Sequence, residues 1–137
     1  MCVEFNKQPD EKINVNDSWQ IKRNPAIAKK VIHDNKYKCQ LDIGHVTFMT
    51  PAGVLYMEGH HLIPCTVDNS ERFKAISKLD REENIVSICP NCHRAIHYGD
   101  ADIKKLLVDT LYVQQSLKLI KAGFNLSLDE LLKLYGI

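Results

Sequence analysis

The sequence lacks any long apolar stretch, any marked excess of one charge and any internal repeat. No apolar run approaches the roughly 18 residues that span a bilayer, and residues 1–7 lack the charged and then apolar pattern of a secretory signal. The formal net charge is only +1, so overall charge selects no class of partner. These absences argue against a membrane-spanning protein and a repeat array, and we expect a soluble, cytoplasmic chain.

The sequence also has little with which to read DNA bases. It holds no helix-turn-helix pattern and no zinc-finger array, which are common motifs for reading bases. A local basic stretch runs from Lys22 to Lys38, with six Lys or Arg residues against one acidic residue, Asp34. That stretch could contact phosphates or could equally be a solvated helix face.

Cysteine occurs five times, an odd number that does not suit a disulfide framework. Cys89 and Cys92 form a Cys-x-x-Cys followed directly by His93, which is typical of metal ligation in a reducing compartment. Cys2 and Cys65 are not needed for such a site, and we expect Cys65 to be a small half-buried thiol.

Metal-ligating residues are concentrated between Tyr56 and Tyr98. Four of the six histidines and three of the five cysteines lie in these 43 residues. Packing alone explains such a density poorly, because histidine is only intermediately buried and a core has no use for paired imidazoles. We therefore expect the rest of the chain to be organised around this stretch.

Local signals predict short strands and helices around that stretch. Asn24 and Pro25 are a helix cap and a first helical residue, which predicts a helix to Asn35. The turn at residues 50–53 predicts strands at 46–49 and 54–57, with the second running into His60-His61. We also expect a helical turn at 70–76, a strand at 85–88, and a helix from Pro90 or Asn91 to Gly99.

The two ends of the chain are expected to be accessory. Residues 1–20 show no sustained period and are interpreted as an arm or linker that docks by Trp19. A long helix should run from Asp100 or Asp102 to Gly123, and a capping box at Ser127 should begin a last short helix. Together these helices would be scaffold or a docking surface, with buried positions at Ile103, Leu106, Leu107, Thr110, Leu111, Leu117, Ile120, Leu128, Leu131, Leu132 and Tyr135.

A structural zinc site is the simplest use of the thiols. Two cysteines that are two residues apart can bind one tetrahedral ion, and a second pair from a distant loop completes four ligands. Cys39 and His45 supply that second pair, and Asp42 could replace His45 as an oxygen ligand. Such an ion would tie the segment after the first helix to the junction of strand and helix.

The remaining histidines suggest a second metal. His93 and His97 share one helix face, and His60 can join them if its strand packs on that helix. Three imidazoles with open positions beside them are typical of a catalytic ion. Neighbouring strand residues point to opposite faces, so His61 is left free to act as a base. The alternatives are that His60 and His61 are a metal-free packing pair, or that all the histidines serve one zinc.

Residues 37–99, roughly half of the chain, resemble the HNH endonucleases of the ββα-metal type. In particular they are similar to the zinc-stapled HNH domains of restriction endonucleases, including those that cut modified-cytosine DNA. The residues that carry the resemblance are His60-His61-Leu62-Ile63-Pro64, Asn84, Cys89-Pro90-Asn91-Cys92-His93 and His97. It implies an α+β fold in which a ββα-metal core with a zinc site is flanked by one N-terminal and two C-terminal helices.

The resemblance also implies roles for individual residues. His60 and His93 would be metal ligands and His61 the general base. Asn84 would orient that base and brace the loop, and His97 would be a third ligand, as in colicin-type members. The departure is that Cys39 begins Cys-Gln-Leu-Asp rather than Cys-x-x-Cys, and we favour His45 as the fourth zinc ligand.

Two charged side chains beside the motif are open to more than one interpretation. Arg94 lies on the same helix as His93 and could clamp a phosphate, or could be an ordinary surface or ion-paired arginine. Glu58 could bind metal or orient His60, but we interpret it as an ordinary carboxylate near a strand end.

We therefore expect a metal-dependent DNA endonuclease that acts in restriction or defence against foreign, including modified, DNA. Its cofactors would be a structural Zn²⁺ and a catalytic Mg²⁺, Mn²⁺, Ni²⁺ or similar ion. The expected division is an arm at 1–20, a nuclease domain at 21–100 and a helical extension at 101–137. A homodimer or an added specificity subunit is left open, as are two alternatives: a zinc-stapled DNA-binding module with an inert HNH site, and a non-specific effector or toxin nuclease.

Overall fold

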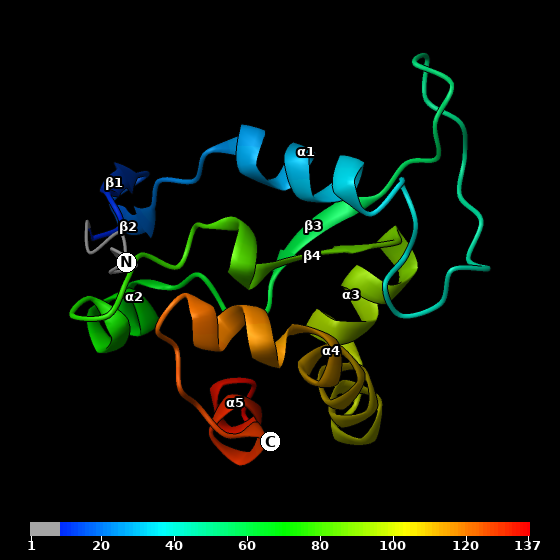
Figure 1. The fold of residues 1–137 in the computed structure, drawn as a ribbon. Helices are drawn as coiled ribbons and strands as arrows, with labels where there is room; N and C mark the ends of the chain where they lie inside the picture. Colours follow the sequence, from blue (N-terminus) through cyan, green and yellow to red (C-terminus); the bar gives the residue numbers. More distant parts are fainter. Residues whose placement is uncertain (1–8) are drawn as a thin grey trace, which may run out of the picture.

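The computed structural model describes residues 9–137, and these residues form an α+β fold with two small antiparallel sheets and five α-helices. The expected α+β class is therefore confirmed. Figure 1 shows α1 lying across the pair β3–β4, with α3, α4 and α5 on the other side of that pair.

The centre of the fold is the antiparallel pair β3 (Glu58–His61) and β4 (Ile85–Ile88). His60 lies opposite Val86 in this pair, and β4 is buried along its whole length. Helix α1 (Pro25–Asp34) packs closely on β3 at Gly59, because a Cβ built there would lie only 2.7 Å from the Cβ of Ala28. Glycine therefore permits the close approach that holds α1 against the strand.

Helix boundaries follow the expected start signals. Asn24 caps α1 as predicted, and α3 (Pro90–Tyr98) begins at Pro90 with Cys89 as a cap that was not predicted; each helix has proline at its start. Asp100 caps α4 (Ala101–Lys121), and Gly123 follows its end with a φ of 94°. The expected capping box is present at Ser127 before α5 (Leu128–Leu134).

The predicted strands at 46–49 and 54–57 are wrong. Within this segment only an isolated bridge forms, between Met49 and Leu55, and the chain makes a loop that projects from the body (Figure 1). Val46 is 81% exposed, and Phe48 stacks on Tyr56 at 4.8 Å rather than on the core. Two short apolar segments on either side of a turn form stable strands only where a second layer covers one face, and this loop has none.

The segment before β4 also differs from expectation. Helix α2 (Val67–Phe73) begins at the cap Thr66, earlier than the helical turn expected at 70–76. A short 3-10 helix, η1 (Glu82–Asn84), then leads into β4.

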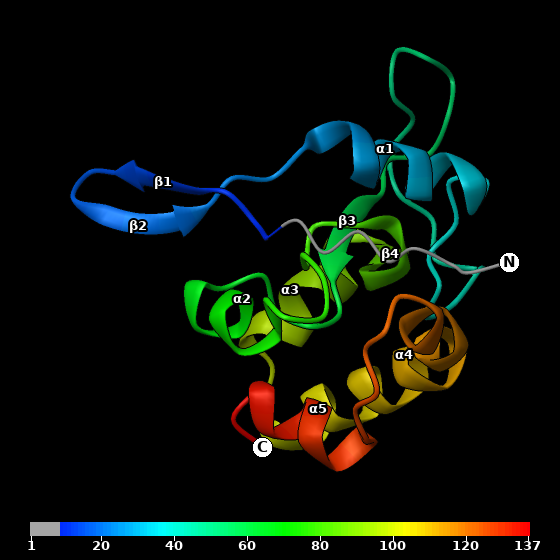
Figure 2. The ribbon, with the colours of Figure 1, turned by 60° about the vertical axis from the view of Figure 1, so that its left-hand side comes forward.

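The amino-terminal arm contains a hairpin that the sequence interpretation missed. Strands β1 (Lys12–Val15) and β2 (Ser18–Ile21) pair across Asn16 and Asp17, which both have positive φ. Asn and Asp tolerate that conformation, which matches the twist of a two-residue hairpin turn. Trp19 is 62% exposed, so the expected docking through Trp19 is wrong, and Figure 2 shows the hairpin reaching away from the body. Cys2 lies outside the described residues.

The long helix α4 buries a different face from the one predicted. Its buried residues are Val108, Leu111, Gln115 and Leu119. Of the predicted stripe, only Leu111 is fully buried, and Ile103, Leu106, Leu117 and Ile120 are exposed. The helix carries apolar residues on two opposite faces, so periodicity alone could not identify the inner face.

One hydrophobic core joins the central strands to the C-terminal helices. The expected buried positions Leu131 and Leu132 of α5 belong to it, with Leu128 and Tyr135 packed at its edge. No helix within residues 9–137 combines the length and the apolar character that crossing a bilayer requires. Core residues with at most 1% exposure include Leu62, Ile88, Ile96, Leu111, Phe124 and Leu131.

Candidate metal centres

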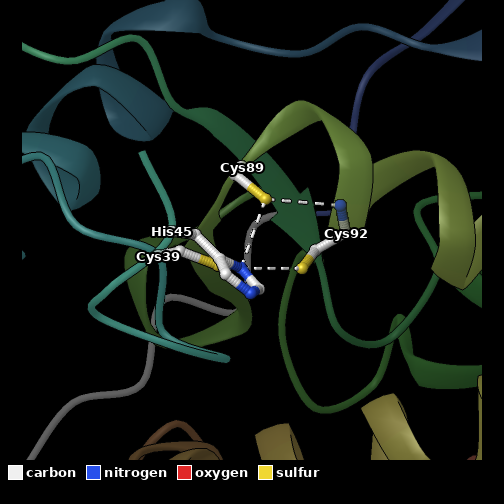
Figure 3. A group of neighbouring side chains, drawn as sticks. All are labelled: Cys39, His45, Cys89 and Cys92. Atoms are coloured by element: carbon white, nitrogen blue, oxygen red, sulfur yellow. Dashed lines mark hydrogen bonds between the residues drawn. The ribbon is translucent and has the colours of Figure 1, made fainter. Parts of the chain in front are cut away.

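Four side chains from three parts of the chain meet at the start of α3. Cys39 follows α1, His45 comes from the projecting loop, and Cys89 and Cys92 occupy the cap and first turn of α3. One potential ligand atom from each residue lies within 4.8 Å of every other (Figure 3). The residues that spacing proposed as zinc ligands are therefore brought together.

The distances within this group suit a tetrahedral ion. Nδ1 of His45 is 3.6 Å from Sγ of Cys89 and 3.4 Å from Sγ of Cys92. Zinc bonds of about 2.3 Å to sulfur and about 2.0 Å to nitrogen, meeting at the tetrahedral angle, place S and N roughly 3.5 Å apart. The Cys92 amide also points to Sγ of Cys89 at 3.4 Å, a contact that stabilises a thiolate. Three thiols and one imidazole therefore fit Zn²⁺.

Asp42 lies beside this group rather than within it. Its Oδ2 is 3.7 Å from Nε2 of His45, on the side of the ring away from the thiols, and its Oδ1 accepts from the Gly44 amide. A carboxylate in that place helps to orient a ligating imidazole. The geometry thus favours His45 over Asp42 as the fourth ligand.

A second group consists of three imidazoles. His60 comes from β3, while His93 and His97 lie one turn apart on α3, and their ligand atoms fall within 4.8 Å of one another. The three ring centroids are 4.9–5.2 Å apart, and the Nε2 atoms of His93 and His97 are 3.1 Å apart. Nitrogens that share an ion at about 2.1 Å are roughly 3.0–3.4 Å apart. The three rings therefore fit a divalent ion.

The orientation of His93 is set by a carboxylate. Nδ1 of His93 lies 2.9 Å from Oε1 of Glu58, and the Tyr56 hydroxyl donates to the other Glu58 oxygen at 2.8 Å. Burial opposes ionisation, but these hydrogen bonds lower the pKa of the Glu58 carboxyl below its ordinary value. An ionised carboxylate can only accept, so Nδ1 of His93 carries the hydrogen and Nε2 is left with a free lone pair. The interpretation of Glu58 as an ordinary carboxylate missed this contact.

The orientation of His60 is set by Tyr135, just after α5. The Tyr135 hydroxyl donates to the Leu62 carbonyl at 2.6 Å and lies 2.8 Å from Nε2 of His60. Its one hydrogen is used by the carbonyl, so it accepts from Nε2–H of His60 and leaves Nδ1 as the free lone pair. Burial keeps the pKa of His60 well below its ordinary value, so this ring is neutral and able to bind metal.

His61 points into a different hydrogen bond. Its Nε2 lies 2.9 Å from Oδ1 of Asp80, and the other Asp80 oxygen accepts from the Asn24 amide at 2.6 Å. Although burial alone would raise it, these two hydrogen bonds lower the pKa of the Asp80 carboxyl. The ionised carboxylate accepts from Nε2–H, so Nδ1 of His61 keeps a lone pair that can take a proton.

Asn84 braces the backbone around these histidines. Its side chain is fully buried, accepts from the Ile63 amide at 2.7 Å, and donates to the carbonyls of Ile63 and Leu79. These bonds fix the segment directly after His61. The side chain of His61 bonds to Asp80, so Asn84 contacts the loop after His61 rather than the His61 ring.

A cavity of about 410 Å³ brings the candidate groups to one space. His60, His61, His93 and His97 line it together with Asp80, although His60 and His61 come from opposite faces of β3. Arg23 also lines the cavity and donates to the Cys65 carbonyl at 3.2 Å. Arg94 is exposed on α3, close enough to lower the pKa of Glu58. The cavity thus combines imidazoles, a carboxylate and a guanidinium.

Three residues of this site escaped the sequence interpretation. Arg23 lay within the basic stretch at Lys22–Lys38 but carried no positional signal. Asp80 carried no signal, and Tyr135 was expected only as a buried position of the last helix. Each reaches its histidine across a long sequence separation, 19 and 75 residues. Cys65, expected to be half-buried, is buried, and this burial raises the pKa of its thiol to about 11.

Proteins similar to this chain include restriction enzymes. No protein-family model matches the chain. The chain is 31% identical over 91 residues to the type IV methyl-directed restriction enzyme EcoKMcrA of Escherichia coli (strain K12). The matched region covers 66% of this chain and 29% of that enzyme, so the chain spans less than a third of this curated relative.

A solved structure is similar over part of its length. It is the type IV phosphorothioation-dependent restriction endonuclease ScoMcrA, with a TM-score of 0.48 and 24% identity. The similarity covers 73% of this chain and 21% of that one.

Proposed function

We propose that residues 21–100 form an HNH endonuclease domain with a ββα-metal core, which hydrolyses DNA phosphodiester bonds with a divalent ion. The core would be β3, β4 and α3. Residues 9–20 would be an arm and residues 101–137 a helical extension. The biological role would be restriction of foreign, including modified, DNA.

One observation carries the proposal: the three imidazoles of His60, His93 and His97 share a cavity with His61, which Asp80 holds with Nδ1 free. If His60 and His61 were only a packing pair, His61 would need no carboxylate partner. His60 would also have no reason to converge with His93 and His97. A single ion shared by all the histidines is also disfavoured, because His45 faces the thiols of Cys89 and Cys92. The similarity to a methyl-directed restriction enzyme supports the substrate class.

The chain's own residues would divide the work of hydrolysis. Nδ1 of His61 accepts a proton from the water that attacks phosphorus, and the Asp80 carboxylate stabilises the imidazolium that results. Arg23 and Arg94 supply positive charge for phosphate oxygens. Asn84 keeps the segment after His61 in place through its three backbone hydrogen bonds.

His60, His93 and His97 would hold the divalent ion, through Nδ1 of His60 and Nε2 of the other two. Such an ion, when bound, neutralises charge on the phosphoryl group and on the leaving oxygen. Imidazole ligands favour Mn²⁺, Ni²⁺, Co²⁺ or Zn²⁺ over Mg²⁺, so activity should appear with several transition ions. Glu58 and Tyr135 would fix the two rings that they contact.

Zn²⁺ at Cys39, His45, Cys89 and Cys92 would have a structural role. It would tie the projecting loop and the segment after α1 to the start of α3, which carries His93. These four residues would supply all the ligands of a tetrahedral ion, as in closed structural zinc sites. The structural Zn²⁺ would then hold α3 and its histidines in position, and the divalent ion at the imidazoles would take part in hydrolysis.

Cleavage of supercoiled plasmid tests the proposal. The chain with its zinc should nick plasmid with Mn²⁺ or Ni²⁺ and should be inactive in EDTA. His61→Ala should lower the nicking rate by about 10²–10⁴-fold, the usual contribution of a general base, with little change in divalent-ion affinity. His33→Ala is the matched control, because His33 is an exposed histidine at the end of α1.

Two results would contradict the proposal. Undiminished nicking by His61→Ala would remove the base. Salt-sensitive DNA binding without nicking under any ion would favour a binding module with an inert site.

A further inference from the structure

The outer face of α4 carries a continuous apolar seam. Five large apolar residues on this helix are exposed by between 44% and 77%, and Thr110 lies in line with them. The opposite face already packs in the core through Val108, Leu111, Gln115 and Leu119. The seam consists of Ile103, Leu106, Thr110, Val113, Leu117 and Ile120.

The spacing of the seam is that of a coiled coil. Steps of three and four residues alternate from Ile103 to Ile120, which places the six residues at successive a and d positions of a heptad repeat. The Thr110 hydroxyl donates to the Leu106 carbonyl at 2.8 Å, so its hydrogen is satisfied within the helix. A strict a/d stripe on a helix whose other face is buried is a pattern for packing a second helix.

The seam is self-complementary in shape when its two copies run antiparallel. From either end it reads Ile, Leu, then a β-branched residue, because Thr110 and Val113 have nearly the same shape. Antiparallel pairing about the midpoint places Ile103 opposite Ile120 of the second copy and Leu106 opposite its Leu117. Thr110 then lies opposite Val113. Each layer of the two-fold contact therefore joins side chains of similar size.

The helix dipoles favour the same arrangement. Antiparallel pairing places the first turn of each α4 beside the last turn of the other copy, so that the two dipoles oppose each other. Parallel pairing would align the dipoles and place like ends side by side.

We propose that α4 is the interface through which two copies of this chain associate, as an antiparallel helix pair about a two-fold axis. The five apolar side chains of the seam are 44–77% exposed and follow one another along the helix, and a contiguous exposed apolar patch of this kind is typical of an interaction site. Specific interfaces bury roughly 1,200–2,000 Å² in total, so residues that flank the seam would also take part in the contact. The occupant is a second copy because the seam complements itself in shape when two copies run antiparallel.

Sedimentation equilibrium of the chain tests the interface. The single chain has a mass of 15.7 kDa, and the apparent mass should rise toward twice that value as concentration increases through the micromolar range. Val113→Lys should weaken self-association at least tenfold while the circular dichroism spectrum and melting temperature stay unchanged. Val46→Lys is the matched control, since Val46 is 81% exposed and Val113 77%.

A charge-pair experiment tests the register. Leu106→Lys and Leu117→Glu should each reduce self-association when studied alone. Mixed together, the two variants should form a heterodimer, because the antiparallel register places position 106 of one copy against position 117 of the other. A parallel pair would leave the new ammonium and the new carboxylate in different layers. Absence of a heterodimer from the mixture would therefore contradict the antiparallel register.

Either of two further outcomes overturns the interface itself. One is a monomer at all concentrations, which would assign the seam to another protein or another part of a longer chain. The other is a dimer that Val113→Lys leaves intact. Neither outcome bears on DNA hydrolysis, which the nicking assay follows separately.

Discussion

The hydroxyl of Tyr135 accepts a hydrogen bond from Nε2 of His60 at 2.8 Å, while its own hydrogen is donated to the Leu62 carbonyl at 2.6 Å. Tyr135 follows α5 and reaches β3 because α5 packs on the same core as that strand. The contact couples the C-terminal helices to the imidazole cluster. It also leaves Nδ1 of His60 as the nitrogen with a free lone pair beside the rings of His93 and His97.

Tyr135→Phe should weaken divalent-ion binding without unfolding the chain. The variant removes the acceptor for Nε2–H of His60, and loss of such an orienting partner lowers metal affinity by about 10–100-fold. Isothermal titration with Mn²⁺ or Ni²⁺ measures the change directly. Tyr112→Phe is the control, because the Tyr112 hydroxyl donates to the Leu126 carbonyl, away from the cluster. Equal affinity in both variants would show that Tyr135 does not position His60.

Asp80→Asn should slow DNA nicking by about 10²–10⁴-fold while the fold is retained, because the amide no longer holds His61 in the required tautomer. The test is the single-turnover nicking rate at saturating Mn²⁺. An unchanged rate would contradict the role of Asp80 in orienting the base.

The same pair should make stability depend on pH. The pKa of Asp80 is lowered by folding, so its contribution is fully present above the unfolded value of about 4 and is lost as pH falls through the folded value. The difference in unfolding free energy between the unmodified chain and Asp80→Asn should therefore shrink as the pH falls below about 4. If this difference in unfolding free energy stays constant as the pH falls below about 4, ionisation of Asp80 does not cause it.

Removal of zinc should unfold the start of α3 and the projecting loop. Binding of a structural zinc contributes an apparent free energy of about 10–16 kcal/mol, which is comparable to the stability of a whole domain. A strong chelator should lower the melting temperature sharply and expose the thiols of Cys39, Cys89 and Cys92 to alkylation. Cys65→Ser is the control and should keep one zinc per chain, because Cys65 lies outside the ligand cluster. A melting temperature that the chelator leaves unchanged would remove the structural role of zinc.

Gly59→Ala should destabilise the fold by about 1–3 kcal/mol, the usual cost of overpacking a tight contact. The added methyl would lie 2.7 Å from Cβ of Ala28. Chemical denaturation measures the loss, and the cost of the same change should be smaller in an Ala28→Gly background. Equal costs in both backgrounds would place the strain elsewhere.

The sequence was informative wherever chemistry is local. Caps at Asn24, Asp100 and Ser127 placed three helix starts, because each cap bonds to an amide within three residues. The spacing of Cys89 and Cys92, and of His93 and His97, likewise depends on one turn of one helix. Such features need no knowledge of the rest of the fold.

The sequence was less informative where a contact joins residues far apart in the chain, and where a helix has two apolar faces. Asp80 and Tyr135 meet their histidines only after β3, α1 and α5 have packed. Helix α4 has apolar residues on both sides, so its pattern could not tell the core face from the outer seam. The turn between the apolar segments 46–49 and 54–57 predicted strands, but no second layer covers that loop.

The most direct test of the two-centre account is a crystal structure of the zinc-loaded chain soaked in Mn²⁺, with anomalous scattering recorded at the zinc and manganese edges. The account predicts zinc among Cys39, His45, Cys89 and Cys92, and manganese in a separate position among His60, His93 and His97. A single ion shared by thiols and imidazoles, or no manganese at the imidazoles, would contradict it.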